Sequence, residues 1–209
     1  MTFAEHETET APAADAALGT RERVVRAASR LMQRQGYDGT GIKQISQEAG
    51  ATLGSVYHFF PGGKQELAVA AIRHGDREFA ESLREALESA DDPADAVVAC
   101  VRDLAEGLRA SDWLDGCPIT STALGTAGRL PGIQQAAAEA FAHWRELVFD
   151  RLRRAGFTEP DAHALAHTVI STLEGAELAA QVARDEEPLL TAGRHLAQLI
   201  GLYRPPTAP

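Results

Sequence analysis

Apolar residues recur at the spacing of an α-helix along most of this 209-residue chain, from about residue 20 to residue 203. No stretch alternates polar and apolar residues as a half-buried strand would. Prolines and capping residues mark helix starts, as at Asp92-Pro93, Pro131, Pro188 and the capping-box variant "TEPD" at 158–161. We therefore predict an all-α protein. The helices expected after residue 64 span 65–89, 93–109, 119–126, 131–154, 159–183 and 188–203.

Three shorter helices are expected before residue 64. The first spans 20–35 and stops at Gly36. Thr40 is the expected cap of the second helix and Thr52 that of the third, and Gly50 suits the turn between them. Two short helices joined by a tight turn that contains glycine are the signature of a helix-turn-helix.

Positive charge is concentrated around this pair of helices. Residues 21–64 hold seven Lys and Arg against three Asp and Glu, a net charge of +4, although the whole chain carries −10. A basic module on an acidic body approaches phosphates in one orientation, because the body is repelled while the module is attracted. The charge pattern therefore favours double-stranded DNA as the partner of residues 21–64.

The second helix of the pair lies in "GATLGSVYHFFPGGK" (50–64), which mixes large rings with small polar residues. Leu53, Val56 and Phe60 lie at i, i+3 and i+7, so we expect them, with Phe59, to pack in the core. Small residues bring a helix close to base edges, hydroxyls reach bases or phosphates, and cations pair with phosphates. The candidate DNA contacts are Thr40, Lys43, Thr52, Gly54, Ser55, Tyr57, His58 and Lys64.

The segment "GTGIKQISQEAGATLGSVYHFFPGGKQELAVAAI" (39–72) resembles the N-terminal domain of TetR-type transcriptional regulators. In that family the recognition helix ends in a step that Tyr57, His58 and Phe60 match, and Lys64 matches the lysine that opens the next helix. The fragments "PGGK", "GCPI" and "FAHWRELV" are similar to the LmrA/YxaF-like branch.

Two residues depart from the family pattern: Gly41 stands where Ser, Thr or Val is usual, and Ala51 stands where Val is usual. Both substitutions soften local packing without changing the assignment. The resemblance implies a helix-turn-helix head, a C-terminal helical bundle with a ligand pocket, and a four-helix dimer interface. The expected parts are a disordered acidic tail (1–19), a DNA-binding domain (20–66), a ligand-binding and dimerisation domain (67–203) and a C-terminal tail (204–209).

The last two long helices are the expected dimer interface. In "HALAHTVISTLEGAELAAQVA" (163–183), small and apolar residues cover most of the helix circumference, which indicates burial on two sides. Two such helices from each of two subunits form a four-helix interface. The alternative is a central core helix in a monomer.

The resemblance also implies a small-molecule effector, and the residues of the central helices suit an apolar one held by a few polar groups. The candidate ligand-binding residues are Trp113, Cys117, Leu124, Phe141, Trp144, Val148 and Glu174. The alternative is that these aromatic and aliphatic residues form a plain core, with Glu174 at an interface or in solvent.

The cysteine and histidine residues give only weak indications of a redox-active thiol or a metal site. No cation adjoins Cys117 in the sequence to lower its thiol pKa, so we expect a buried apolar side chain rather than a redox sensor. His163 and His167 have the spacing of metal ligands, but no third ligand motif accompanies them. We expect no metal and no cofactor.

Taken together, these features predict a sequence-specific DNA-binding regulator, a homodimeric repressor that a small apolar ligand releases from a palindromic operator. The alternative is an architectural, ligand-independent DNA-binding protein. The sequence contains no G-x-S-x-G, P-loop, H-E-x-x-H or Rossmann motif, so we do not expect an enzyme. It shows no signal-peptide pattern and no apolar run long enough for a membrane, so we expect a cytoplasmic protein.

Overall fold

The computed structural model describes residues 18–204, and every regular element in this range is a helix, which confirms the all-α prediction. The predicted tails at 1–19 and 204–209 lie almost entirely outside the described residues. Helix ends differ from the expected ones by at most two residues, except that α2 continues past the expected stop at Gly36 to Gly39, across a kink. The helices are α2 (Thr20–Gly39), α3 (Ile42–Glu48), α4 (Leu53–Phe59), α5 (Gly63–Glu88), α6 (Pro93–Ala110), α7 (Thr120–Thr126), α8 (Pro131–Arg154), α9 (Glu159–Ala183) and α10 (Glu187–Leu202).

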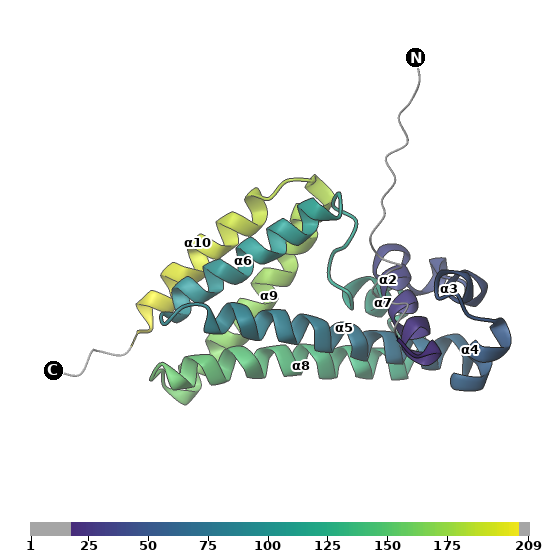
Figure 1. Cartoon of the computed structure of the whole chain (residues 1–209). Helices are drawn as coiled ribbons and strands as arrows, with labels where there is room; N and C mark the ends of the chain where they lie inside the picture. Colours follow the sequence, from purple (N-terminus) through teal and green to yellow (C-terminus); the bar gives the residue numbers. More distant parts are fainter. Residues whose placement is uncertain (1–17, 205–209) are drawn as a thin grey trace, which may run out of the picture.

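Helices α2, α3 and α4 form a head at one end of the molecule (Figure 1). Val56 and Phe60 are buried in its core, as their spacing predicted, and Phe59 packs against the core from a half-buried position. The same prediction is wrong for Leu53, which is 43% exposed. As the first residue of α4, Leu53 lies a full turn before the part of the helix that reaches the other two.

The end of α2 is reshaped by Gly36. This residue leaves helical geometry with a φ of 67°, a conformation that favours glycine. The Thr40 hydroxyl donates a hydrogen bond of 2.8 Å to the Gly36 carbonyl, and Thr40 is completely buried. Gly41, not Thr40, is the residue that precedes α3, so the predicted capping role of Thr40 is wrong.

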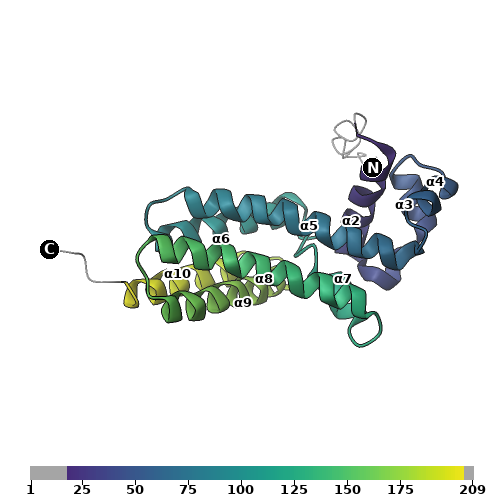
Figure 2. The same ribbon diagram turned by 90° about the horizontal axis from the view of Figure 1, so that it is seen from below.

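One continuous helix, α5, joins the head to the rest of the molecule and runs alongside α8 (Figures 1 and 2). The domain boundary predicted at residue 66 falls inside α5. Between the two helices the rings of Phe79 and Trp144 lie 4.4 Å apart, centroid to centroid. Trp144 is completely buried and Val148 is 1% exposed, so both pack in the hydrophobic core.

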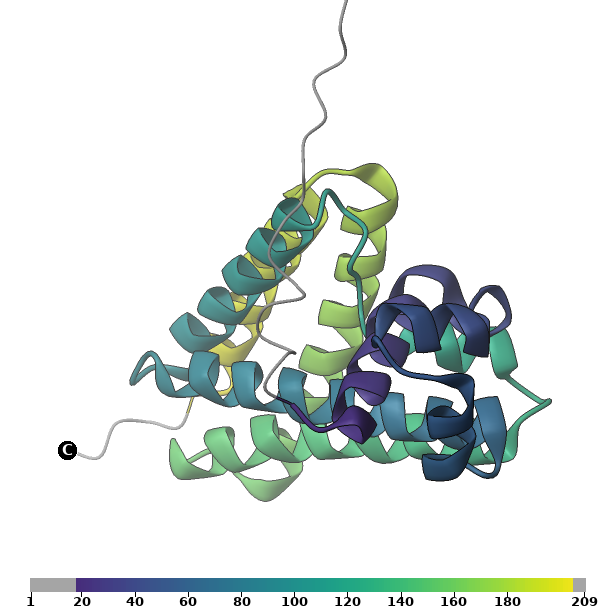
Figure 3. The same cartoon turned by 45° about the vertical axis from the view of Figure 1, so that its right-hand side comes forward.

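Helices α6, α9 and α10 form the second half of the molecule, and α6 packs closely on α10. A Cβ on Gly193 of α10 would lie only 3.0 Å from the Val101 Cγ2 atom of α6, which explains a glycine in the middle of a helix. The loop 111–119 descends from the end of α6 along α9 toward α7 (Figure 3). It thereby passes between the two halves of the molecule.

Candidate nucleic-acid interface and effector site

The outer surface of α4 combines small and polar side chains. Thr52, Gly54, Tyr57 and His58 are exposed, and Tyr57 keeps 51% of its surface open to solvent. Thr52 caps the helix as predicted, since its hydroxyl accepts a hydrogen bond of 3.1 Å from the Ser55 amide. The two hydroxyls of Thr52 and Ser55 also lie 2.9 Å apart, so the first turn of α4 presents a pair of linked hydroxyl groups.

Lysine side chains precede and follow α4 in the chain. Lys43 is exposed in the first turn of α3. The Lys64 ammonium lies over the Tyr37 ring, 4.3 Å from its centroid, and burial lowers the pKa of Lys64. This cation–π contact holds Lys64 at the start of α5, next to Gly63 with its φ of 66°.

Seven of the eight candidate DNA contacts thus lie in exposed or half-buried positions, in the head or at the start of α5. Thr40 is the exception, because its hydroxyl is buried and bonded to Gly36. We therefore remove Thr40 from the set of candidate side-chain contacts.

A cavity of about 480 Å³ opens between α7, α8 and α9, and we call it the effector cavity after its candidate role. Leu124, Phe141 and Glu174 line it, as the sequence suggested, together with Arg145. Leu124 is 68% exposed at its mouth. The remaining lining residues are Thr120, Ala123, Ala138, Ile170, Ser171, Gly175 and Leu178.

The cavity wall is apolar except for a few groups, of which Glu174 is the one best fixed. The Thr120 hydroxyl donates a hydrogen bond of 3.0 Å to Glu174 Oε2. Burial raises the pKa of Glu174, and hydrogen bonds from Cys117 and Thr120 partly offset that effect. Four of the seven candidate ligand residues do not line this cavity: Trp113, Cys117, Trp144 and Val148.

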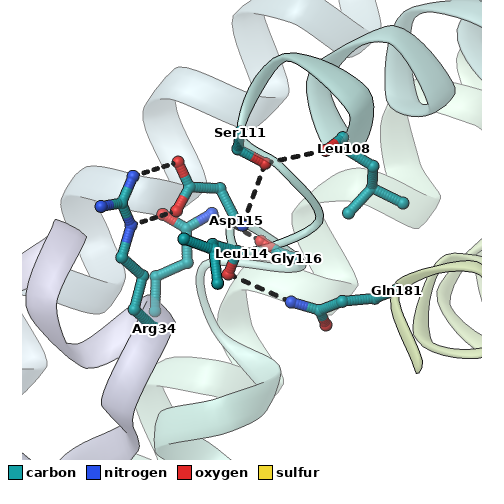
Figure 4. A network of polar contacts seen from close by, with 8 residues as sticks. Arg34, Leu108, Ser111, Leu114, Asp115, Gly116 and Gln181 are labelled. Carbon is teal, nitrogen blue, oxygen red and sulfur yellow. Dashed lines mark hydrogen bonds and ion pairs between the residues drawn. The ribbon is translucent and has the colours of Figure 1, made fainter. Parts of the chain in front are cut away.

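The loop 111–119 is attached to both halves of the molecule, as Figure 4 shows. On the head side, Arg34 of α2 donates two hydrogen bonds to the Asp115 carboxylate, at 2.5 and 2.8 Å, and Gln33 donates one to the Gly116 carbonyl. On the other side, the Gln181 amide of α9 donates a bond of 3.1 Å to the Leu114 carbonyl.

Close packing and unusual backbone geometry accompany these bonds. A Cβ on Gly116 would lie 2.4 Å from Gln181 Oε1, and a Cβ on Gly75 of α5 would lie 2.9 Å from Pro118 Cβ. Asp112 and Trp113 both adopt positive φ, 52° and 65°, which is costly for residues with a side chain. The loop is therefore held in a strained shape by contacts to α2, α5 and α9.

Cys117, Glu174 and Glu177 come together where this loop meets α9. Their donor atoms lie within 4.8 Å of one another, the arrangement that could hold a metal ion. Burial raises the pKa of the Cys117 thiol above its usual range, so the structure does not activate it as a nucleophile. His163 and His167, the pair with ligand spacing in the sequence, are not part of this group.

Sequence reasoning missed this group because Cys117 is distant from the two glutamates in the sequence. The available signal was the pair of acids three residues apart in an otherwise apolar helix.

None of the helices within 18–204 is both long enough and apolar enough to cross a membrane.

Comparisons with known proteins match both halves of the chain. The family profile "Bacterial regulatory proteins, tetR family" matches residues 24–71, and "Transcriptional regulator LmrA/YxaF-like, C-terminal domain" matches residues 93–195. The HTH-type transcriptional regulator LmrA of Bacillus subtilis (strain 168) is 33% identical over 171 residues, which cover 82% of this chain and 91% of that protein.

Solved structures give the same picture. A TetR transcriptional regulator from Chloroflexus aurantiacus is 31% identical, with a TM-score of 0.73 over 87% of this chain and 94% of that one. The regulator CifR, solved with a 26 bp double-strand operator DNA, is 20% identical with a TM-score of 0.73 over 85% of this chain and 95% of that one. At this identity the second similarity concerns the fold alone.

Proposed function

This chain belongs to the TetR family of bacterial transcriptional regulators, and from that premise we propose that it is a homodimeric repressor released from a palindromic operator by a small apolar ligand. DNA binding is the common property of the family, and the head supplies it here. The observation that carries the proposal is the surface of α4. Thr52, Gly54, Tyr57 and His58 face outward from a helix that Val56 and Phe60 anchor in the core.

A helix of this kind fits the major groove because its first turn is small. Gly54 lets the helix axis approach the base edges, while the hydroxyls of Thr52 and Ser55 offer donors and acceptors to them. Tyr57, Lys43 and Lys64 have the reach to contact phosphates on either side, which fixes the register of the helix on the duplex.

The dimer proposal rests on exposed apolar surface of α9 and α10. Leu178 is 51% and Val182 78% exposed on α9, and Leu202 is 82% exposed at the end of α10. Large exposed apolar side chains that recur on neighbouring helices mark interaction surfaces. A two-fold dimer through these helices would present two α4 helices to successive major grooves, about 34–36 Å apart. Sedimentation of the protein–DNA complex should give two protomers per site or a multiple of two.

The release proposal rests on the position of the effector cavity. Its wall includes α7, and α7 packs directly against α2 of the head. Arg129, just after α7, also pairs with Asp38 of α2 at 2.5 Å. A ligand that shifts α7 would therefore shift the head. A coupling free energy of about 1–3 kcal/mol would weaken DNA binding roughly 5- to 150-fold.

The release proposal is tested by titrating the operator complex with apolar ligands. We expect an effective ligand to bind free protein more tightly than DNA-bound protein. The variant Phe141→Ala, which alters the cavity wall far from α4, should keep operator binding and lose the response. Ligands that fill the cavity without changing DNA affinity would contradict the proposal.

The same family membership supports a regulatory rather than a catalytic role, since the relatives carry the names of transcriptional regulators. A protein that binds operator DNA works at the bacterial chromosome. We accordingly propose a cytoplasmic location.

A further inference from the structure

We propose that Cys117, Glu174 and Glu177 form a binding site for a thiol-preferring divalent cation such as Zn²⁺, at the junction of the loop 111–119 and α9. This goes beyond the proposed function, because it assigns an ion to a group of which only Glu174 also lines the effector cavity.

The geometry of the three donors carries the first step. Glu174 and Glu177 lie three residues apart on α9, which places their carboxylates on the same side of the helix. Gly116 lets the loop approach α9 so closely that Gln181 occupies the position of a missing Cβ. The next residue, Cys117, is thereby brought within 4.8 Å of both carboxylates, donor atom to donor atom. This is the one such group among the described residues 18–204.

Glu177 provides an independent reason to expect a ligand. Its side chain is only 8% exposed, and no side chain or backbone group of the described residues donates a hydrogen bond to it or forms an ion pair with it. A mostly buried carboxylate without a protein partner is unusual, and Glu177 meets only the small cavity that it lines. Its carboxylate instead faces the other two donors.

The charge around the group selects a cation. Glu174 is contacted by the Thr120 hydroxyl and the Cys117 thiol, which are neutral donors. Across the described residues, no Lys, Arg or His pairs with either carboxylate. Two carboxylates and a thiolate carry three negative charges, most of which a divalent ion would neutralise.

The donor types narrow the choice of ion. Carboxylate oxygens alone would suit Mg²⁺ or Ca²⁺, but a cysteine sulfur favours Zn²⁺ and similar borderline ions. Zinc takes Cys sulfur at about 2.3 Å and carboxylate oxygen at about 2.0–2.2 Å, so the three donors need only a small inward movement. Glu177 also lines a cavity of about 240 Å³ between α5, α6 and α9, which leaves room for a water as fourth ligand.

The site would be linked to the head through the chain itself. Cys117 follows Gly116 and Asp115, which are bonded to Gln33 and Arg34 of α2. An ion that fixes Cys117 on α9 would therefore fix the segment that touches the head.

Cobalt(II) titration of the full-length protein, stripped of metal by a chelator, tests the site. We expect one Co²⁺ per protomer with a thiolate-to-cobalt charge-transfer band in the near ultraviolet, displaced by Zn²⁺ but not by Mg²⁺. Cys117→Ser should abolish the band. Cys100→Ser is the matched control and should retain it, because Cys100 is a buried thiol outside the group.

Zinc competition with a chromophoric chelator gives a second measurement, which does not depend on cysteine. Glu177→Gln, which preserves the shape of the side chain, should weaken Zn²⁺ binding at least tenfold. A charge-transfer band that persists in Cys117→Ser, or Zn²⁺ affinity unchanged in Glu177→Gln, would overturn the proposal, as would the absence of Co²⁺ and Zn²⁺ binding to the wild type. These titrations contain no DNA, so their result is independent of operator binding and release.

Discussion

Neighbouring residues of α4 have opposite surroundings, and this division explains how so short a helix can be both stable and available to DNA. Val56 and Phe60 are buried in the head, while Tyr57 and His58 between them are exposed. The buried pair fixes the direction in which the exposed pair points.

Lys43 is the simplest test of phosphate contact. In the variant Lys43→Ala we expect weaker binding to all DNA sequences, and a plot of log affinity against log salt that is shallower by about one unit, since one counterion-releasing contact is lost. Fluorescence anisotropy over a salt series measures both. Arg102→Ala on α6 is the control, because it removes the same charge from an exposed residue outside the head. Equal effects of the two variants would remove Lys43 from the interface.

A substitution of Phe60 tests whether this buried ring anchors α4 in the core of the head. It is 1% exposed, and Arg21 lies over its ring, 5.2 Å from the centroid. Phe60→Ala should lower the free energy of unfolding by about 3–5 kcal/mol through lost burial and a residual cavity. Urea denaturation measures the loss. Phe59→Ala, at a half-buried position beside it, should cost clearly less, and equal losses would show that the spacing argument misplaces the core.

Periodicity predicted Val56 and Phe60 correctly because a helix in contact with two others must bury one side. It failed for Leu53 and Thr40 because residues at a helix end follow the local path of the chain. Leu53 extends past the packed part of α4, and Thr40 turns inward to bond Gly36.

Helix starts were the most predictable features among the elements. Asp92 before Pro93 and Thr158 before Asp161 both cap their helices as the sequence indicated. The helices expected at 93–109 and 119–126 leave a break where the loop 111–119 lies, but the attachments of this loop were not predictable. They depend on close approaches at Gly75 and Gly116, and the sequence does not say which element will lie against a glycine.

The cap at Asp92 leads to a prediction about pH. Burial acts to raise the pKa of Asp92, but the hydrogen bond from the Ala94 amide and the ion pair with Arg204 hold it below the usual 3.8. A lowered folded-state pKa stabilises the protein above the unfolded pKa, and this contribution is lost as the pH falls through the folded value. Asp92→Ala should therefore lower the unfolding free energy by about 1 kcal/mol at pH 7, and by progressively less below about pH 4.

This difference in unfolding free energy is measured by urea denaturation of the wild type and the variant between pH 3 and pH 7, in steps of about one pH unit. Asp91→Ala is the matched control, since the neighbouring carboxylate is exposed and does not cap the helix. A difference for Asp92→Ala that stays constant over the whole range would contradict the assignment.

Replacement by alanine should change the stability of the protein in opposite directions at two glycines that lie in helices. In Gly75→Ala the new methyl group would meet the Pro118 ring at 2.9 Å and push the loop from α5, which should cost about 1–3 kcal/mol. In Gly107→Ala nothing lies within 4 Å, so the higher helix propensity of alanine should stabilise the protein by about 0.5–1 kcal/mol. Thermal unfolding distinguishes the two, and stabilisation by both would show that the loop is not pressed against α5.

In the whole molecule, the order of helices was predictable while the contacts between distant segments were not. Each helix can be recognised from the local spacing of its apolar residues, and the head also matches a known sequence pattern. The effector cavity and the Cys117–Glu174–Glu177 group depend on how α7, the loop and α9 come together. Trp144 and Val148 illustrate the limit, because an apolar stripe looks the same in the sequence whether it lines a cavity or fills a core.

The loop 111–119 should transmit the effector response to the head. Asp115→Ala removes the paired hydrogen bonds to Arg34 while it leaves the effector cavity and α4 intact. We expect nearly unchanged operator affinity and a loss of most of the ligand-induced release, measured by anisotropy with and without ligand. Asp112→Ala is the control, because Asp112 pairs with Arg184 at the end of α9 rather than with the head. A normal response in Asp115→Ala would assign transmission to α7 alone.

The central claim is that the head reads a specific DNA sequence as part of a dimer. Fluorescence anisotropy of the purified protein against the DNA that flanks its own gene, beside a scrambled fragment of equal length, tests it most directly. We predict tight, selective binding to the flanking DNA with two protomers per site, and weak, salt-sensitive binding to the scrambled fragment. Equal and equally salt-sensitive binding to both fragments would contradict the account and favour a sequence-independent architectural role.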